Sequence, residues 1–165
     1  MNLSRLFRHV FTTRAGMRRR FDAAALGQIE AAIQQVESRI SGEVRFVVEA
    51  ALDVDDLIAG TAPRTRALAL FSQLGVWDTE ANNGVLIYVL LADRDVEIVA
   101  DRDIARRVSQ QEWEGVCREI ESHFREGRFA QGSVAGIHSV GRLVEKHFPG
   151  QGPDANELPN QPVLL

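Results

Sequence analysis

Two groups of acidic residues stand where neighbouring strands of one sheet would bring them together. Asp55 and Asp56 follow an apolar segment at 43–50, and Asp93 follows a second apolar segment at 85–91. The carboxyl ends of parallel strands share one edge of a sheet, where α/β proteins bind their ligands. Ca²⁺ and Mg²⁺ need several carboxylate or carbonyl oxygens converging on one point. We therefore predict that Asp55, Asp56 and Asp93 are ligands of one divalent cation, Ca²⁺ or Mg²⁺.

The arginine next to the third acid adds a group that recognises anions. The planar guanidinium of Arg94 can hold a phosphate through two parallel hydrogen bonds. A bound cation polarises a phosphoryl oxygen, so the pattern predicts phosphate-ester chemistry with Arg94 as the substrate-binding residue. No serine, cysteine or histidine has the context of an activated nucleophile, and no catalytic residue is assigned. The alternative is that these acids belong to a solvated loop.

A second polar group would lie at the opposite end of the same sheet. Its members are Asp78, Asn82, Asp101 and Asp103, which flank the two strands of the expected hairpin. Turn formation and helix capping account for the same residue types, and we prefer the first group. Asn83-Gly84, just before the central strand, is expected to supply a positive φ angle.

The segments between these residues predict the elements that position them. The run 85–91 is continuously apolar, which is typical of a strand covered on both faces. The order of strand 43–50, amphipathic helix 64–74 and strand 85–91 predicts a right-handed parallel crossover. After a turn at 92–95, residues 96–100 return as the second strand of an antiparallel hairpin.

Helical stripes before and after this unit complete the expected fold. Apolar residues recur at helical spacing between 26 and 40, and again from 104 to 148 in two segments separated near Gly127. We therefore predict an α/β protein, a three-layer α/β/α sandwich around a small mixed sheet with C-terminal helices. The expected organisation is a basic amphipathic arm and linker at 1–20, the domain at 21–149, and a flexible tail at 150–165.

The charge of the chain is divided unevenly. Residues 1–21 carry six arginines and no acid, whereas the whole chain of 165 residues has a net charge of −4. The remaining body is therefore acidic, which argues against a nucleic-acid partner. The single cysteine, Cys117, excludes an internal disulfide and a multi-cysteine zinc site.

The basic arm has the pattern of a short amphipathic helix, in which apolar and basic residues alternate at helical spacing. Its apolar members are Leu3, Leu6, Phe7, Val10 and Phe11. Such helices lie on anionic membrane surfaces, so we expect peripheral membrane contact through residues 3–14. Packing against the domain itself or fraying of the terminus are the alternatives.

Three segments together resemble the TPM domain family. They are Asn82-Asn83-Gly84-Val85-Leu86-Ile87, Asp93-Arg94-Asp95-Val96-Glu97-Ile98, and Phe124-Arg125-Glu126-Gly127-Arg128-Phe129-Ala130-Gln131-Gly132. The resemblance runs from about residue 22 to residue 148. The family includes thylakoid-lumen proteins linked to photosystem II repair and bacterial envelope proteins. Membership implies an α/β/α sandwich and two suggested activities, acid phosphatase chemistry and divalent-cation binding.

The chain departs from the family pattern in two respects. Ala100-Asp101-Arg102 stands where the family has a glycine-rich strand end. Members of the family often carry a signal peptide and a C-terminal membrane helix, whereas no segment here approaches the ~20 apolar residues of a span. The expectation is a cytoplasmic offshoot of the family, peripheral to the inner membrane. We expect a non-catalytic accessory module with a protein partner, and the alternative is a divalent-cation-dependent acid phosphatase-like enzyme.

Overall fold

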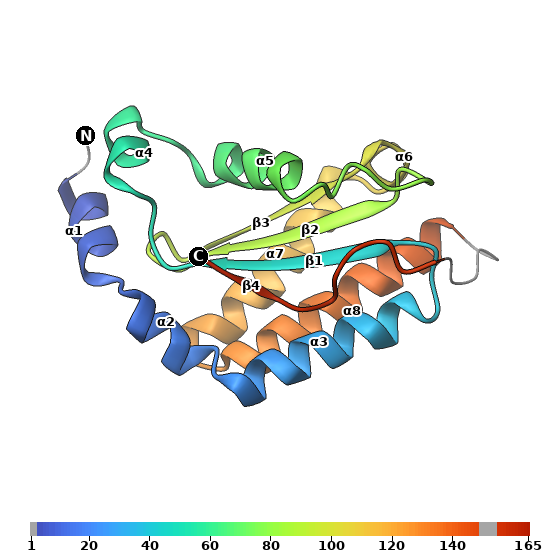
Figure 1. Ribbon diagram of the computed structural model, residues 1–165, viewed down its shortest axis with the longest axis horizontal. Coiled ribbons are helices and arrows are strands. Elements are labelled where there is room, and N and C mark those ends of the chain that lie inside the picture. Colours follow the sequence, from blue (N-terminus) through green and yellow to red (C-terminus); the bar gives the residue numbers. More distant parts are fainter. Residues whose placement is uncertain (1–2, 149–154) are drawn as a thin grey trace.

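A central mixed sheet organises the computed structural model, which describes residues 3–148 and 155–165 (Figure 1). Its strand order is β3-β2-β1-β4. The strands are β1 (Glu43–Glu49), β2 (Gly84–Leu90), β3 (Asp95–Ala100) and β4 (Val163–Leu164). The helices are α1 (Leu3–Phe11), α2 (Arg14–Arg20), α3 (Ala23–Glu37), α4 (Val54–Ala59), α5 (Pro63–Gln73), α6 (Arg102–Ala105), α7 (Gln110–Arg125) and α8 (Phe129–His147).

The predicted crossover and hairpin are both confirmed. β1 and β2 run parallel, with Glu43 opposite Gly84 and Glu49 opposite Leu90. β2 and β3 run antiparallel around the turn that contains Asp93. Every residue of β1 and β2 is buried, as a continuous apolar strand requires in the middle of a covered sheet.

Helices cover both faces of the sheet, so the predicted three-layer α/β/α sandwich is also confirmed (Figure 1). α3, α7 and α8 pack on one face, where Ile33, Ile120 and Ile137 are among the fully buried side chains. α5 lies on the other face and contributes Ala67 and Leu70 to a second core.

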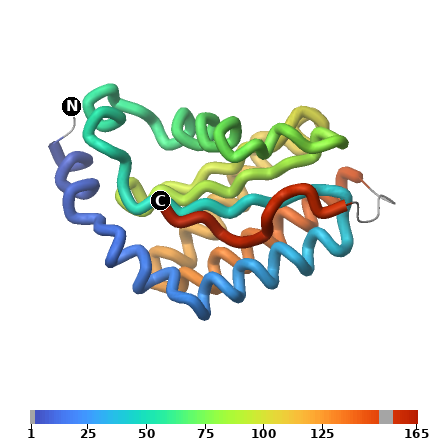
Figure 2. Tube along the Cα trace, viewed as in Figure 1, coloured from blue at the N-terminus to red at the C-terminus, as the bar shows by residue number. Residues whose placement is uncertain are grey.

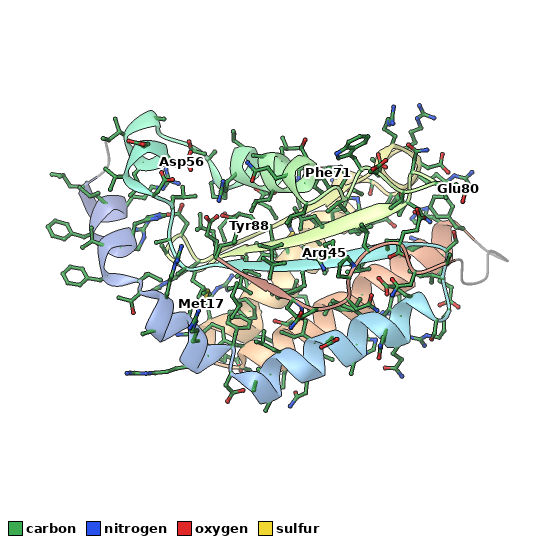
Figure 3. The ribbon with its side chains drawn as sticks, in the orientation of Figure 1. Met17, Arg45, Asp56, Phe71, Glu80 and Tyr88 are labelled. Atoms are coloured by element: carbon green, nitrogen blue, oxygen red, sulfur yellow. The ribbon has the colours of Figure 1, made fainter. Side chains whose placement is uncertain are left out.

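The segment predicted as a linker is helical instead. Thr13 caps α2 by accepting a hydrogen bond from the N–H of Gly16, and Met17 is buried against the domain at 1% exposure (Figure 3). Met17 is thus the buried apolar side chain of α2, next to the arginines at its end. α2 therefore continues directly into the packed structure at Phe21, which is also buried.

The end of the chain follows the edge of the sheet, which differs from the predicted flexible tail. Residues 155–165 run beside β1, and β4 pairs with it in parallel (Figure 2). Arg45 donates to the carbonyls of Pro159 and Gln161, and Glu43 accepts from the N–H of Leu158 at 2.9 Å. Because Glu43 and Arg45 lie on β1, far away in the sequence, the composition of residues 155–165 could not reveal these hydrogen bonds. Residues 150–154 of the predicted tail lie outside the described residues.

Gly84 is required for close packing and not for its φ angle. The positive φ predicted for Asn83-Gly84 occurs instead at the preceding residue, Asn82 (51°). A Cβ atom on Gly84 would collide with the backbone carbonyl oxygen of Val76. The glycine therefore permits the loop before β2 to cross the start of the strand.

Candidate functional site

Asp93 binds the basic face of α1. Its carboxylate accepts from Arg5 Nε at 2.9 and 3.1 Å and from Arg5 Nη2 at 2.7 Å. His9 Nε2 lies 3.1 Å from Asp93 Oδ1, and Arg8 Nη2 lies 3.5 Å from the same oxygen. The Asp93 side chain is 9% exposed and that of His9 is 1% exposed. A nearly buried cluster of ion pairs thus connects the β2–β3 turn to α1.

His9 joins this cluster to the segment after β1. Its Nδ1 accepts a hydrogen bond from the backbone N–H of Leu52 at 3.0 Å. Because that nitrogen acts as an acceptor, it carries no proton, and Nε2 carries the proton that points to Asp93. Neutral His9 therefore bridges the ends of two neighbouring strands. Arg5 adds a further link by donating to the carbonyl of Thr61 at 2.7 Å.

The same contacts set the ionisation of the carboxylate. Burial alone would raise the pKa of Asp93, but hydrogen bonds from Arg5 and His9 outweigh it, so the pKa is lowered below its ordinary value. The hydrogen bond with Asp93 correspondingly raises the pKa of Arg5. Asp93 is an ionised partner of α1 at neutral pH.

The other two predicted cation ligands lie on α4. Asp53 caps this helix by accepting from the N–H of Asp56 at 2.9 Å, and Asp55 and Asp56 occupy the first turn. Asp56 Oδ1 accepts from the hydroxyl of Thr61 at 2.8 Å, and its side chain projects from α4 (Figure 3). Over residues 3–148 and 155–165, no group of three His, Cys, Asp or Glu side chains is placed to hold a metal ion. The cation site at Asp55, Asp56 and Asp93 stays a prediction.

Thermal unfolding tests this site directly. A cation at Asp93 must compete with the guanidinium of Arg5, so we expect millimolar Ca²⁺ or Mg²⁺ to leave the unfolding midpoint unchanged. Specific binding to the folded state raises the midpoint by mass action. A rise in the wild type that Asp56→Asn abolishes and Asp78→Asn preserves would contradict this expectation and support the cation site.

The second acidic group serves the backbone at the opposite end of the sheet. Asp101 caps α6 by accepting from the N–H of Arg102 at 2.6 Å. Asn82 accepts from Arg102 Nη2 at 3.1 Å, and its carbonyl accepts from the N–H of Asp103. Asp78 is exposed in the loop before β2. Turn and capping roles, which the sequence raised as the alternative, account for these contacts.

A buried polar network beneath α5 was not predicted. Glu49 receives two hydrogen bonds from Arg66, at 2.8 and 3.0 Å, and one from the Tyr88 hydroxyl at 2.6 Å. Burial, followed by the bond to Glu49, raises the pKa of Tyr88. The carboxylate, guanidinium and hydroxyl groups thus serve as hydrogen-bond partners for one another. The sequence signal was a tyrosine in an otherwise aliphatic strand, since a buried hydroxyl requires a partner.

The apolar face of α1 points away from the domain. Phe7 and Phe11 are 60% and 76% exposed and stack on each other with ring centroids 6.3 Å apart, while Leu3 and Val10 are also exposed. Leu6 turns inward and packs against the core. The helix thus docks through its charged side and presents its apolar side to the surroundings. This is the reverse of the usual arrangement on a globular protein.

α4 also exposes apolar side chains. It lies beside α1 at one end of the molecule (Figure 1), and Arg5 of α1 donates to the carbonyl of Thr61, just after α4. Val54 and Ile58, one helical turn apart, are both exposed. We call Leu3, Phe7, Val10, Phe11, Val54 and Ile58 the apolar end surface. Exposed apolar residues gathered in this way mark interaction sites.

Arg94 faces a different region from the acids with which it was grouped. It occupies the β2–β3 turn with a φ of 57°, and it lines a cavity together with Arg20 and Arg125. None of the three predicted cation ligands lines this cavity. The role of Arg94 in binding an anion stays a prediction, but its neighbours are two further arginines.

The domain is one with recognised relatives. The TPM domain model matches residues 18–143, which include the whole sheet except β4. The chain belongs to the TPM domain family. α1 lies outside the matched range, so the ion-pair cluster and the apolar end surface combine family and flanking residues.

Solved structures agree with this assignment. The BA42 protein from the psychrophilic bacterium Bizionia argentinensis is 34% identical, with a TM-score of 0.73 over 87% of this chain and 94% of that one. The N-terminal domain of a P. gingivalis protein shares the fold at 20% identity, with a TM-score of 0.61 over 76% of each chain. The N-terminal domain of the Corynebacterium glutamicum protein cg2496 does so at 15% identity, with a TM-score of 0.56 over 82% and 81%. A search of curated proteins finds no match.

Proposed function

We propose that this TPM-domain protein is a non-catalytic accessory module that attaches to an anionic membrane surface through the apolar end surface. The observation that carries the proposal is the orientation of α1, whose aromatic side chains point outward while its arginines and histidine hold it to Asp93. A helix fixed in this way is already folded and oriented before it meets a membrane. It therefore loses little conformational entropy on binding.

The charge of the N-terminal helices supports an anionic lipid surface as the partner. α1 and α2 contain six arginines and no acid, and Arg8, Arg14, Arg18, Arg19 and Arg20 are exposed. Each basic residue near an anionic membrane surface contributes about 1 kcal/mol. Basic helices with exposed aromatic side chains lie in the membrane interface. In the described part of the chain, no helix is long and apolar enough to span a bilayer.

Vesicle partitioning tests the proposal. The double substitution Phe7→Ser/Phe11→Ser should weaken binding to vesicles containing phosphatidylglycerol by at least about tenfold, because burial of each aromatic side chain is worth roughly 1.5–3 kcal/mol. Added salt should also weaken vesicle binding by the wild-type protein, since it screens the charges of the arginines. Co-sedimentation of the full chain with vesicles measures both effects.

The matched control replaces two exposed apolar residues elsewhere. Leu68 and Trp77, on and just after α5, are about half exposed, and Leu68→Ser/Trp77→Ser should leave partitioning unchanged. Equal binding by the wild type and the Phe7/Phe11 variant would overturn the proposal. A cytoplasmic location and a protein partner recruited to the membrane belong to the same proposal, and the phosphatase alternative is tested by turnover of a generic phosphomonoester.

A further inference from the structure

Three arginines from separate elements surround one cavity, and we infer that this cavity binds the terminal phosphate of a lipid headgroup or of a soluble ester. Arg20 comes from the end of α2, Arg94 from the β2–β3 turn and Arg125 from the last turn of α7. The cavity has a volume of about 270 Å³. That volume is suited to a phosphate and the first atoms of its alcohol. If the phosphate belongs to a lipid, the inference rests on the proposed membrane attachment.

Neighbouring side chains position the guanidinium groups of Arg20 and Arg125, and a tight turn positions the backbone of Arg94. Arg20 lies over the ring of Phe129, with its central carbon 5.3 Å from the ring centroid. Arg125 is oriented by Glu121 at 3.5 Å, one helical turn earlier. Arg94 follows the buried Asp93 cluster, and its backbone N–H bonds to the carbonyl of Leu91 at 3.1 Å. Arginines anchored by packing and turns require little further ordering to bind a phosphate.

The charge balance of the cavity favours an anion. Its lining includes three arginines and one carboxylate, Glu121, which is already paired with Arg125. Within residues 3–148 and 155–165, neither Arg20 nor Arg94 forms an ion pair with a carboxylate. Two positive charges are therefore uncompensated. The arrangement is that of guanidinium clusters that recognise phosphate by charge-assisted hydrogen bonds.

Apolar side chains form the rest of the cavity lining. The rings of Phe124 and Phe129 lie 5.0 Å apart, and the buried end of β2 lies against the cavity at Val89, Leu90 and Leu91. Apolar side chains beside the arginines lower the local dielectric constant and so strengthen the attraction between an arginine and a phosphate. No hydroxyl, thiol or imidazole is among the lining side chains, and the inference concerns binding of the phosphate.

The location links this cavity to the membrane. α2, the β2–β3 turn and the α7–α8 connection lie at the end of the molecule where α1 presents its apolar face (Figures 1 and 2). Arg94 directly follows Asp93, the anchor of α1. A headgroup phosphate could therefore reach the cavity while the apolar end surface enters the interface.

Nuclear magnetic resonance of the full chain tests the binding of soluble esters. Titration with inorganic phosphate or glycerol 1-phosphate should produce saturable shifts at Arg94 and at the end of α7. Arg94→Gln/Arg125→Gln should weaken the affinity by about tenfold or more, since each lost charge-assisted bond has an effect of this size. The control Arg14→Gln/Arg18→Gln removes two exposed arginines of α2 that do not line the cavity. Unsaturable shifts, or equal weakening by the control, would overturn the inference.

Vesicles distinguish the source of the phosphate. At equal surface charge, the wild type should prefer phosphatidic acid, which has a terminal phosphate, to phosphatidylglycerol, and Arg94→Gln/Arg125→Gln should remove only this preference. Phe7→Ser/Phe11→Ser should weaken binding to both vesicles and retain binding of soluble phosphate. Saturable phosphate binding without a preference for phosphatidic acid would support the cavity and overturn its lipid source. Failure of vesicle binding alone would overturn the proposed function and leave the cavity supported.

Discussion

Replacing Asp93 with asparagine should release α1 from the domain. The change removes the carboxylate that Arg5 and His9 contact, and it leaves their donors facing a neutral amide in a nearly buried site. Removal of one partner from a buried ion pair costs about 3 kcal/mol or more. Hydrogen exchange of the α1 amides should therefore be faster by about a hundredfold, because exchange reports this local opening.

The dependence of α1 docking on pH has a defined sign. The pKa of Asp93 is lower in the folded protein than its ordinary value, so its contribution is fully present above the ordinary carboxylate pKa of about 3.9. It is lost as the pH falls through the lower folded-state pKa. The protection factors of the α1 amides, which correct for slower intrinsic exchange at low pH, should thus fall below about pH 4 in the wild type. They should depend less on pH in Asp93→Asn.

Asp78→Asn is the matched control, because Asp78 is exposed in the loop before β2 at the opposite end of the sheet. It should leave exchange in α1 unchanged. Unaltered protection of α1 in Asp93→Asn would show that Leu6 and the backbone contacts hold the helix without the ion pairs.

Replacing Gly84 with alanine should strongly destabilise the whole domain. The added Cβ would meet the carbonyl oxygen and the side chain of Val76, and backbone cannot move aside as a flexible side chain can. Overpacking typically costs 1–3 kcal/mol, and contact with backbone at the start of a central strand should reach about 3 kcal/mol. Urea unfolding should show a lower midpoint with an unchanged slope.

Gly27→Ala provides the comparison with an unobstructed glycine. Gly27 is exposed on α3, and a Cβ there would have no neighbour within 4 Å. Alanine should stabilise the helix by about 0.5–1 kcal/mol, because it restricts the unfolded chain and favours helix. The prediction would be wrong if Gly84→Ala were no more destabilising than Gly27→Ala. The loop before β2 would then have moved aside to make room for the added Cβ.

The candidate site was predicted only in part, and the reason lies in the N-terminal segment. The pattern of α1 revealed an amphipathic helix but not which face would pack against the domain. Arg5 and His9 bind Asp93 because the β2–β3 turn brings that carboxylate beneath them. The same turn separates Arg94 from the acids and places it beside Arg20 and Arg125.

The amino-acid sequence by itself determined the sandwich, the parallel crossover and the hairpin. Those features follow from the spacing of apolar residues and from the residue types that form turns. Both are local properties that can be read directly along the chain. Tertiary structure alone decided which partners the charged side chains find and where residues 155–165 lie. Ion pairs and edge-strand hydrogen bonds join residues far apart in the chain, such as Arg5 with Asp93 and Arg45 with Gln161. Their energy depends on distance and burial in three dimensions, which no spacing along the chain encodes.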